Sequence, residues 1–175
     1  MNTQAELQTQ LLRGLEALDA RLRLADLSAA PAGGWSAAQI LEHVAMLNSA
    51  YLARLRPLAG RGEPVADGAW RPTLLGGYLT TALTKPAKLS TPAAARPGPV
   101  ARPGVLDAVL ATHAELRQLI RQAEGLNWRR LKLTSPYAWF LRPNFGDACL
   151  LILRHGERHA AQIERLTSSR VSTSG

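Results

Sequence analysis

Residues 150–166 read Leu150-Leu-Ile-Leu-Arg-His155-Gly-Glu-Arg-His159-Ala-Ala-Gln-Ile-Glu-Arg-Leu166. At about 100° per residue this stretch is an amphipathic helix, and His155 and His159 lie in the middle of its apolar stripe. The two imidazoles then stand one above the other, about 6 Å apart along the helix axis. Such a pair can bind one metal ion, or it can be two histidines of a helical core. A third ligand on another helix would favour the metal.

Three other stretches, over about 4–27, 36–58 and 103–124, repeat apolar residues at the same helical spacing. Polar pairs mark three of the four helix starts: Thr3 with Glu6, Ser36 with Gln39, and Asn144 with Asp147. Four amphipathic helices of similar length, with a long link after the second, predict an all-α fold. The expected architecture is a four-helix bundle with a long crossover between helices 2 and 3.

The length of 175 residues suits one domain, which we expect over residues 1–168. Residues 169–175 are small and polar, so a flexible C-terminal tail is expected there. The N-terminus lacks the basic and apolar segments of a signal peptide, and no apolar run is long enough to cross a membrane. These features predict a soluble cytoplasmic protein without a membrane partner.

The chain is basic, with a formal net charge of +8, which raises the question of a nucleic-acid partner. Its arginines are nevertheless spread over the whole sequence, and only 5% of residues are aromatic. We interpret the charge as a solvated, Arg-rich surface and expect no nucleic-acid partner. Cys149 is the single cysteine, so it forms no intramolecular disulfide, and we expect a buried hydrophobic residue rather than a nucleophile.

Two links interrupt the helical pattern. Residues 61–102 are rich in proline and glycine, with room for one short helix between Leu74 and Leu83. A link of this length either covers the mouth of a site or is a flexible excursion. Residues 125–143 carry Trp128, Pro136, Tyr137, Trp139 and Phe140, aromatics that can pack over the end of the core and also wall a pocket.

A third imidazole is available from His43, on the flank of the apolar face of the second helix. If the second and fourth helices are neighbours, His43 can face His155 and His159 across the bundle. Three neutral imidazoles suit Zn²⁺, Ni²⁺ or Fe²⁺ and leave coordination positions open. His113, at the edge of the third helix, is either a fourth ligand or a partly exposed histidine.

The spacing of the pair invites comparison with His-Glu-x-x-His metalloproteases, but the comparison fails. The residue after His155 is Gly156, and Glu157 points about 180° away from the pair. Glu42, next to His43, is also expected off the core face. Without a carboxylate as general base, peptide hydrolysis is disfavoured. Gln162 can hydrogen-bond an imidazole or a bound water, or it is only a polar residue at the edge of the stripe.

Two motifs resemble the signatures of the DinB-like (YfiT-like) superfamily. The first is Trp35-Ser36 followed by Gln39-Ile-Leu-Glu-His43-Val, and the second is His155-Gly-Glu-Arg-His159-Ala-Ala-Gln162-Ile-Glu. The segments 85–97 and 135–146 fit the looser middle of the pattern, so that the resemblance covers most of residues 1–166. It implies a four-helix bundle, a three-histidine metal site at His43, His155 and His159, and a homodimer.

The resemblance also implies a class of activity. Characterised relatives include S-transferases that use low-molecular-weight thiols, a thiol-dependent isomerase and some hydrolase-like members. We therefore expect a divalent-metal enzyme that activates such a thiol, or water, against a small electrophile. The alternatives are a non-catalytic metal-binding protein of a DNA-damage or stress response, to which the family name refers, and a basic nucleic-acid-associated module.

Overall fold

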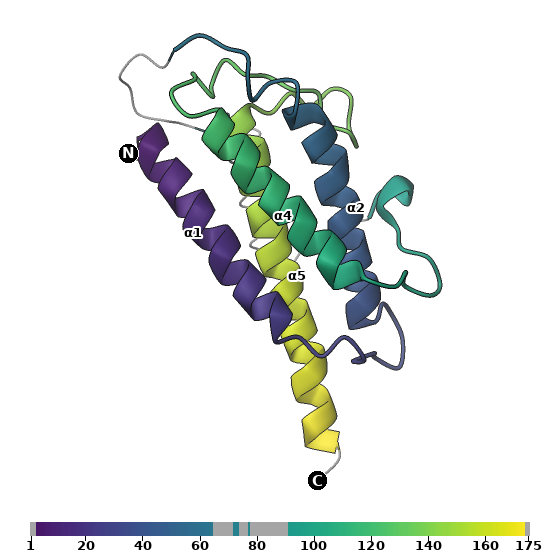
Figure 1. Cartoon of the computed structure of the whole chain (residues 1–175). Coiled ribbons are helices and arrows are strands. Elements are labelled where there is room, and N and C mark those ends of the chain that lie inside the picture. The colour runs from purple at the N-terminus through teal and green to yellow at the C-terminus, as the bar shows by residue number, and fades with distance from the viewer. Residues whose placement is uncertain (1–2, 65–71, 74–76, 78–90, 174–175) are drawn as a thin grey trace.

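The computed structural model describes residues 3–64, 72–73, 77 and 91–173. Figure 1 shows four long helices: α1 (Gln4–Arg23), α2 (Ala37–Leu55), α4 (Val105–Gln122) and α5 (Phe145–Thr173). A short 3₁₀ helix, η1 (Ala93–Ala95), lies in the link before α4. No strand occurs in these described ranges, which contain two isolated bridge pairs only. The expected all-α four-helix bundle is confirmed.

The helices start where the polar pairs predicted. Thr3 Oγ1 accepts from Glu6 N at 3.1 Å, and the Glu6 carboxylate accepts from Thr3 N at 2.7 Å. Ser36 and Gln39 form the same capping box at α2. At α5, Asp147 N donates to Asn144 Oδ1 at 2.9 Å, and Asn144 N donates to Asp147 Oδ2 at 3.1 Å.

Three helix boundaries differ from the prediction, which made these helices too long. Helix α1 stops at Arg23 and not near residue 27, because Asp26 turns the chain by accepting from Ser28 N. Helix α2 stops at Leu55, two residues before Pro57, whose missing N–H cannot continue the ladder. Helix α4 begins at Val105, since Gly104 takes a left-handed conformation with φ of 71°.

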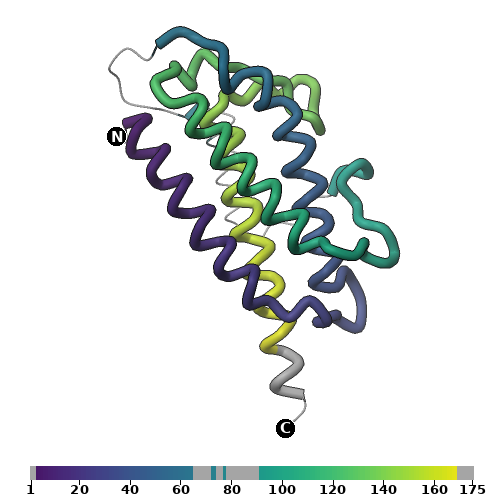
Figure 2. The backbone as a smooth tube through the Cα atoms, in the orientation of Figure 1, coloured from purple at the N-terminus to yellow at the C-terminus, as the bar shows by residue number. Residues whose placement is uncertain are grey.

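The order of the helices around the bundle places the histidines. Helix α2 packs against α4 and α5, and α1 packs against the same two helices from the other side. The backbone trace in Figure 2 shows the link from α1 to α2 at one end of the bundle and the link from α4 to α5 at the opposite end. Because α2 and α5 are neighbours, side chains on their facing sides meet inside the bundle. The leucine seam of α1 closes the core opposite them: Leu7, Leu11, Leu15, Leu18 and Leu22.

Glycines let α1 and α5 approach closely. A Cβ on Gly156 would lie 2.6 Å from Leu18 Cδ2, and a Cβ on Gly14 would lie 2.7 Å from Leu153 Cδ2. Each helix thus inserts a leucine over the other's glycine. Gly156, which replaces the glutamate of a metalloprotease motif, is part of this packing.

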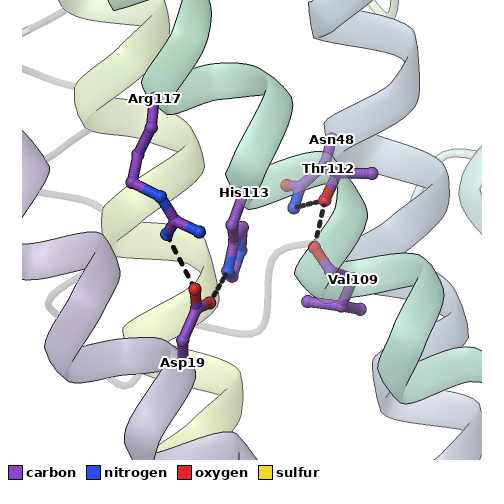
Figure 3. Close-up of polar contacts among 6 residues, drawn as sticks. All are labelled: Asp19, Asn48, Val109, Thr112, His113 and Arg117. Atoms are coloured by element: carbon purple, nitrogen blue, oxygen red, sulfur yellow. Dashed lines mark hydrogen bonds and ion pairs between the residues drawn. The ribbon is translucent and has the colours of Figure 1, made fainter.

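His113 was expected to be partly exposed or a fourth ligand, and both alternatives are wrong. Its side chain is fully buried between α1 and α4, where Nδ1 lies 2.6 Å from Asp19 Oδ1. Arg117 Nη1 donates to Asp19 Oδ2 at 2.7 Å (Figure 3). Burial by itself raises the pKa of the Asp19 carboxyl, but the hydrogen bonds from His113 and Arg117 outweigh it and hold the pKa below its ordinary value.

A second polar contact joins α2 to α4. Asn48 Nδ2 donates to Thr112 Oγ1 at 2.9 Å, and Thr112 Oγ1 donates to Val109 O at 2.6 Å (Figure 3). These side chains are buried, so the contact fixes the register of the two helices.

The remaining expectations concern the links and the tail. Most of the region between Leu74 and Leu83, where a short helix was expected, lies outside the described residues. Helix α5 continues to Thr173, and the division into a domain over 1–168 and a flexible tail over 169–175 stays a prediction. Among the helices described, none combines the length and apolar character that a membrane crossing requires.

Replacing Asp19 by Asn tests the buried contact of α1 with α4. The variant leaves the guanidinium of Arg117 without its carboxylate in a largely buried position, so we expect the free energy of unfolding to fall by about 3 kcal/mol in urea. Asp107→Asn, at an exposed position of α4, is the matched control and should cost at most about 0.5 kcal/mol. Equal effects of the two substitutions would contradict the role of Asp19.

Candidate metal centre

Three imidazoles converge between α2 and α5. His43 Nε2 lies 3.1 Å from His155 Nε2, and His159 Nε2 lies 3.1 Å from the same atom. The three donor atoms lie within 4.8 Å of one another, and no other group of at least three His, Cys, Asp or Glu side chains in the described residues has this arrangement. The structure therefore brings together the three histidines that the sequence singled out.

Hydrogen bonds to the outer ring nitrogens decide which atoms are free to bind. His43 Nδ1 lies 2.6 Å from Ala95 O, and a carbonyl only accepts, so Nδ1 carries the proton. His159 Nδ1 lies 2.9 Å from Gln162 Oε1 and carries its proton for the same reason. In the neutral rings, Nε2 of both side chains is then an unprotonated lone pair directed at His155.

His155 is buried, as His43 is, whereas His159 is half-buried. Its Nδ1 has no hydrogen-bond partner in the described structure, and its Nε2 faces two lone pairs but can donate to only one of them. Three nitrogens around an ion at 2.0–2.1 Å in tetrahedral geometry would be separated by about 3.3–3.4 Å, close to the two spacings of 3.1 Å to His155 Nε2. The donor set and its spacing fit a divalent cation.

The environment keeps the imidazoles neutral. Burial lowers the pKa of His43, although the hydrogen bond to Ala95 opposes the shift. Burial and then the neighbouring His159 and His43 lower the pKa of His155 well below its ordinary value. For His159, burial and then His43 lower the pKa to about 4. Neutral imidazole is the form that binds a metal.

A backbone segment from the crossover holds His43 in place. Ala95 lies in η1 and is fully buried, and its carbonyl is the partner of His43 Nδ1. The segment is tied to α2 by Gln39, whose Nε2 donates to Gly98 O at 2.7 Å and Pro99 O at 3.1 Å. Gln39 thus closes the capping box and anchors the carbonyl-bearing segment. Sequence reasoning missed this role of Ala95, since a backbone carbonyl has no signal in the residue pattern.

Trp35 packs on the outer side of His43, with ring centroids 5.2 Å apart and planes tilted by 45°. The predicted partnership of Gln162 with an imidazole is present on His159. The aromatics of the second link divide into two groups: Trp128 is fully buried, whereas Trp139 and Phe140 are largely exposed.

The carboxylates next to these histidines in the sequence are not part of the donor group. Glu157 pairs with Arg154 at 2.8 Å, as expected for a residue on the far side of α5. Glu42 was expected off the core face; instead its side chain is buried, with Oε1 paired to Arg102 at 2.8 Å. Neither belongs to the donor group. Cys149 is buried and also outside it, and burial raises the pKa of its thiol, as expected for a structural residue.

Acidification should destabilise the chelator-treated protein. The folded-state pKa values of the three histidines lie below the ordinary value of 6.5, so the unfolded chain binds more protons once the pH falls below 6.5. Stability is then lost between about pH 6.5 and pH 4, by about 1.4 kcal/mol per pH unit for each histidine that stays neutral when folded.

Urea unfolding at pH 7.5, 6 and 5 measures this slope. His155→Gln should reduce it by about one histidine's share, because one buried titrating group is removed. A free energy of unfolding that is constant, or that rises, from pH 7.5 to pH 5 would contradict the neutral cluster.

Comparison with known proteins shows to which family the chain belongs. Searches of curated proteins and of solved structures returned no match. A family model described as the DinB superfamily matches residues 5–163, a span that contains all three clustered histidines and the capping residues of α2 and α5. Because this match covers most of the chain, the protein belongs to the DinB superfamily.

Proposed function

We propose that this chain is a metal-dependent transferase. His43, His155 and His159 would hold one divalent ion, Zn²⁺, Ni²⁺ or Fe²⁺, and the enzyme would join a low-molecular-weight thiol to a small electrophile. The observation that carries the proposal is the convergence of imidazole lone pairs in a buried position without a hydrogen-bond donor for each of them. Family membership supports it.

A bound ion of this kind supplies Lewis acidity, which lowers the pKa of a coordinated thiol or water toward neutrality. The chain's own residues prepare the position for it. Ala95 O and Gln162 Oε1 fix the tautomers of His43 and His159, so that both rings present Nε2. Trp35 covers one side of His43 and restricts water there.

The lack of a carboxylate in the donor group favours a thiol over water as the nucleophile. Glu42 and Glu157 pair with arginines away from the cluster, and the donor group contains no Asp or Glu from the described residues. Hydrolysis usually needs a base to take the proton of the attacking water, whereas a thiol that has lost its proton needs none. Peptide hydrolysis is therefore the weaker proposal, as the sequence indicated.

The lack of a carboxylate from the described residues in the donor group also favours a second candidate, a non-catalytic metal-binding protein of a stress response. The same three ligands would serve in it. The homodimer, the cytoplasmic location and the lack of a nucleic-acid partner stay predictions.

The metal site is tested by titrating the chelator-treated protein, without a His-tag, with Zn²⁺ or Ni²⁺ in a calorimeter. We expect one ion per chain, and a loss of affinity of at least about 100-fold for His43→Ala, His155→Ala and His159→Ala. The matched control is His113→Gln, a substitution of the fourth histidine, which lies outside the donor group. Circular dichroism checks that each variant is folded. Unchanged affinity in the three alanine variants would overturn the site.

The reaction is tested with small thiols and a chromogenic electrophile. The metal-loaded protein should accelerate thiol consumption, and His159→Ala or removal of the metal should reduce the rate to that of the uncatalysed reaction. Cys149→Ala is the control that should keep the activity, because this thiol is buried outside the cluster. Full metal binding without acceleration for any thiol would select the non-catalytic alternative.

A further inference from the structure

We propose that the chain has a second ligand site, for a small molecule carrying a phosphate or carboxylate group, at the end of the bundle where α5 begins. The site is a pocket lined by three cationic side chains. It lies about 16 Å from His155 along the axis of α5, because His155 follows Asn144 by eleven positions and each position adds about 1.5 Å of helical rise. The proposal is independent of the metal centre.

The pocket has a volume of about 340 Å³, within the range of small-molecule sites. Two segments from the links and the cap of α5 build it. Its lining residues are Pro72, Thr73, Asn127, Arg129, Arg130, Lys132 and Asn144.

Two of the three positive charges in this pocket are not neutralised by a described residue. Arg130 pairs with Glu63, but Arg129 and Lys132 make no ion pair with any described residue. Among the described residues that line the pocket there is no carboxylate. Asp147, in the α5 cap, is already bonded, since its Oδ2 accepts from Thr73 Oγ1 at 2.7 Å and from Asn144 N at 3.1 Å. The pocket therefore presents at least two uncompensated positive charges to a ligand.

The local sequence explains why the cations gather here. Trp128 is fully buried, and its Nε1 donates to Ala123 O at 2.9 Å. Leu131 and Leu133 are buried as well, so the intervening Arg130 and Lys132 are directed outward. Apolar side chains on the inner side thus hold the basic side chains on the outer side.

Backbone hydrogen bonds preorganise this segment. Asn127 N donates to Glu63 O at 2.9 Å, and Phe145 N donates to Leu131 O at 2.9 Å. The backbone of Lys132 also forms an isolated antiparallel β-bridge with that of Asn144, the capping residue of α5. Because these bonds exist before a ligand arrives, less ordering is needed on binding.

The lining selects the class of ligand. Guanidinium groups bind carboxylate and phosphate oxygens through paired N–H donors, and the Lys132 ammonium adds a point charge. Side-chain amides of Asn127 and Asn144 can donate to further oxygens. The recess is small and bordered by Asn144 of the α5 cap. A duplex would instead require an extended basic stripe.

The site is tested with the full-length, metal-loaded protein by NMR and calorimetric titration at constant ionic strength. The probes are inorganic phosphate, pyrophosphate and succinate, which separate phosphate from carboxylate recognition. We expect saturable binding, with shifted resonances at residues 127–132 and 144. The double substitution Arg129→Gln/Lys132→Gln should weaken it at least about 10-fold.

The matched control is Arg23→Gln/Arg142→Gln, which removes two exposed charges outside the pocket and keeps the affinity. Equal weakening by both double substitutions, or no saturation by any probe, would overturn the proposal. Tighter binding of duplex DNA that is lost in Arg129→Gln/Lys132→Gln would overturn the assignment to small molecules. His155→Ala should abolish metal binding and leave anion binding intact; loss of both would contradict the independence of the two sites.

Discussion

The contact between His155 and the two imidazoles beside it is the constraint on which the rest of the structure depends. Nε2 atoms of His43 and His159 both lie 3.1 Å from His155 Nε2, and hydrogen bonds at their outer nitrogens make both atoms acceptors. A buried cluster of this kind, without a cation, leaves lone pairs facing one another in a low-dielectric position. A divalent ion would relieve that conflict, and this is how the fold is connected to the proposed function.

Helix α5 has three structural roles: it carries two of the clustered histidines, it packs closely against α1, and its cap borders the cationic pocket. The face with His155 and His159 packs toward α2, whereas Gly156 allows Leu18 of α1 to approach from another side. The Asn144–Asp147 cap begins the helix and at the same time borders the cationic pocket. The buried Asp19–His113–Arg117 contact joins α1 to α4. The histidine cluster lies instead between α2 and α5. The polar groups of the core thus divide into a structural set and the histidine set that we propose to hold the metal.

Helical periodicity and capping residues were sufficient to predict the four helices and the histidine cluster. Apolar spacing follows from burial, and the Ser36–Gln39 and Thr3–Glu6 boxes are local, so both can be read along the chain. Helix ends were less predictable because local turns, such as the one at Asp26, compete with the ladder. The sequence could not indicate that His113 is buried, since its partner Asp19 is 94 residues away. The role of Ala95 was also hidden, because its contribution is a backbone carbonyl brought in by the crossover.

X-ray absorption at the K-edge of a stoichiometrically bound metal tests the central claim most directly, because it counts the ligands of the ion in the intact protein. For Zn²⁺ we predict a first shell with three imidazole nitrogens at about 2.0–2.1 Å and one or two further light atoms. Substitution of His155 by Ala should remove the three-imidazole signature. A shell of oxygen ligands without imidazole scattering, or one that His155→Ala leaves unchanged, would show that the metal binds elsewhere and would contradict the account.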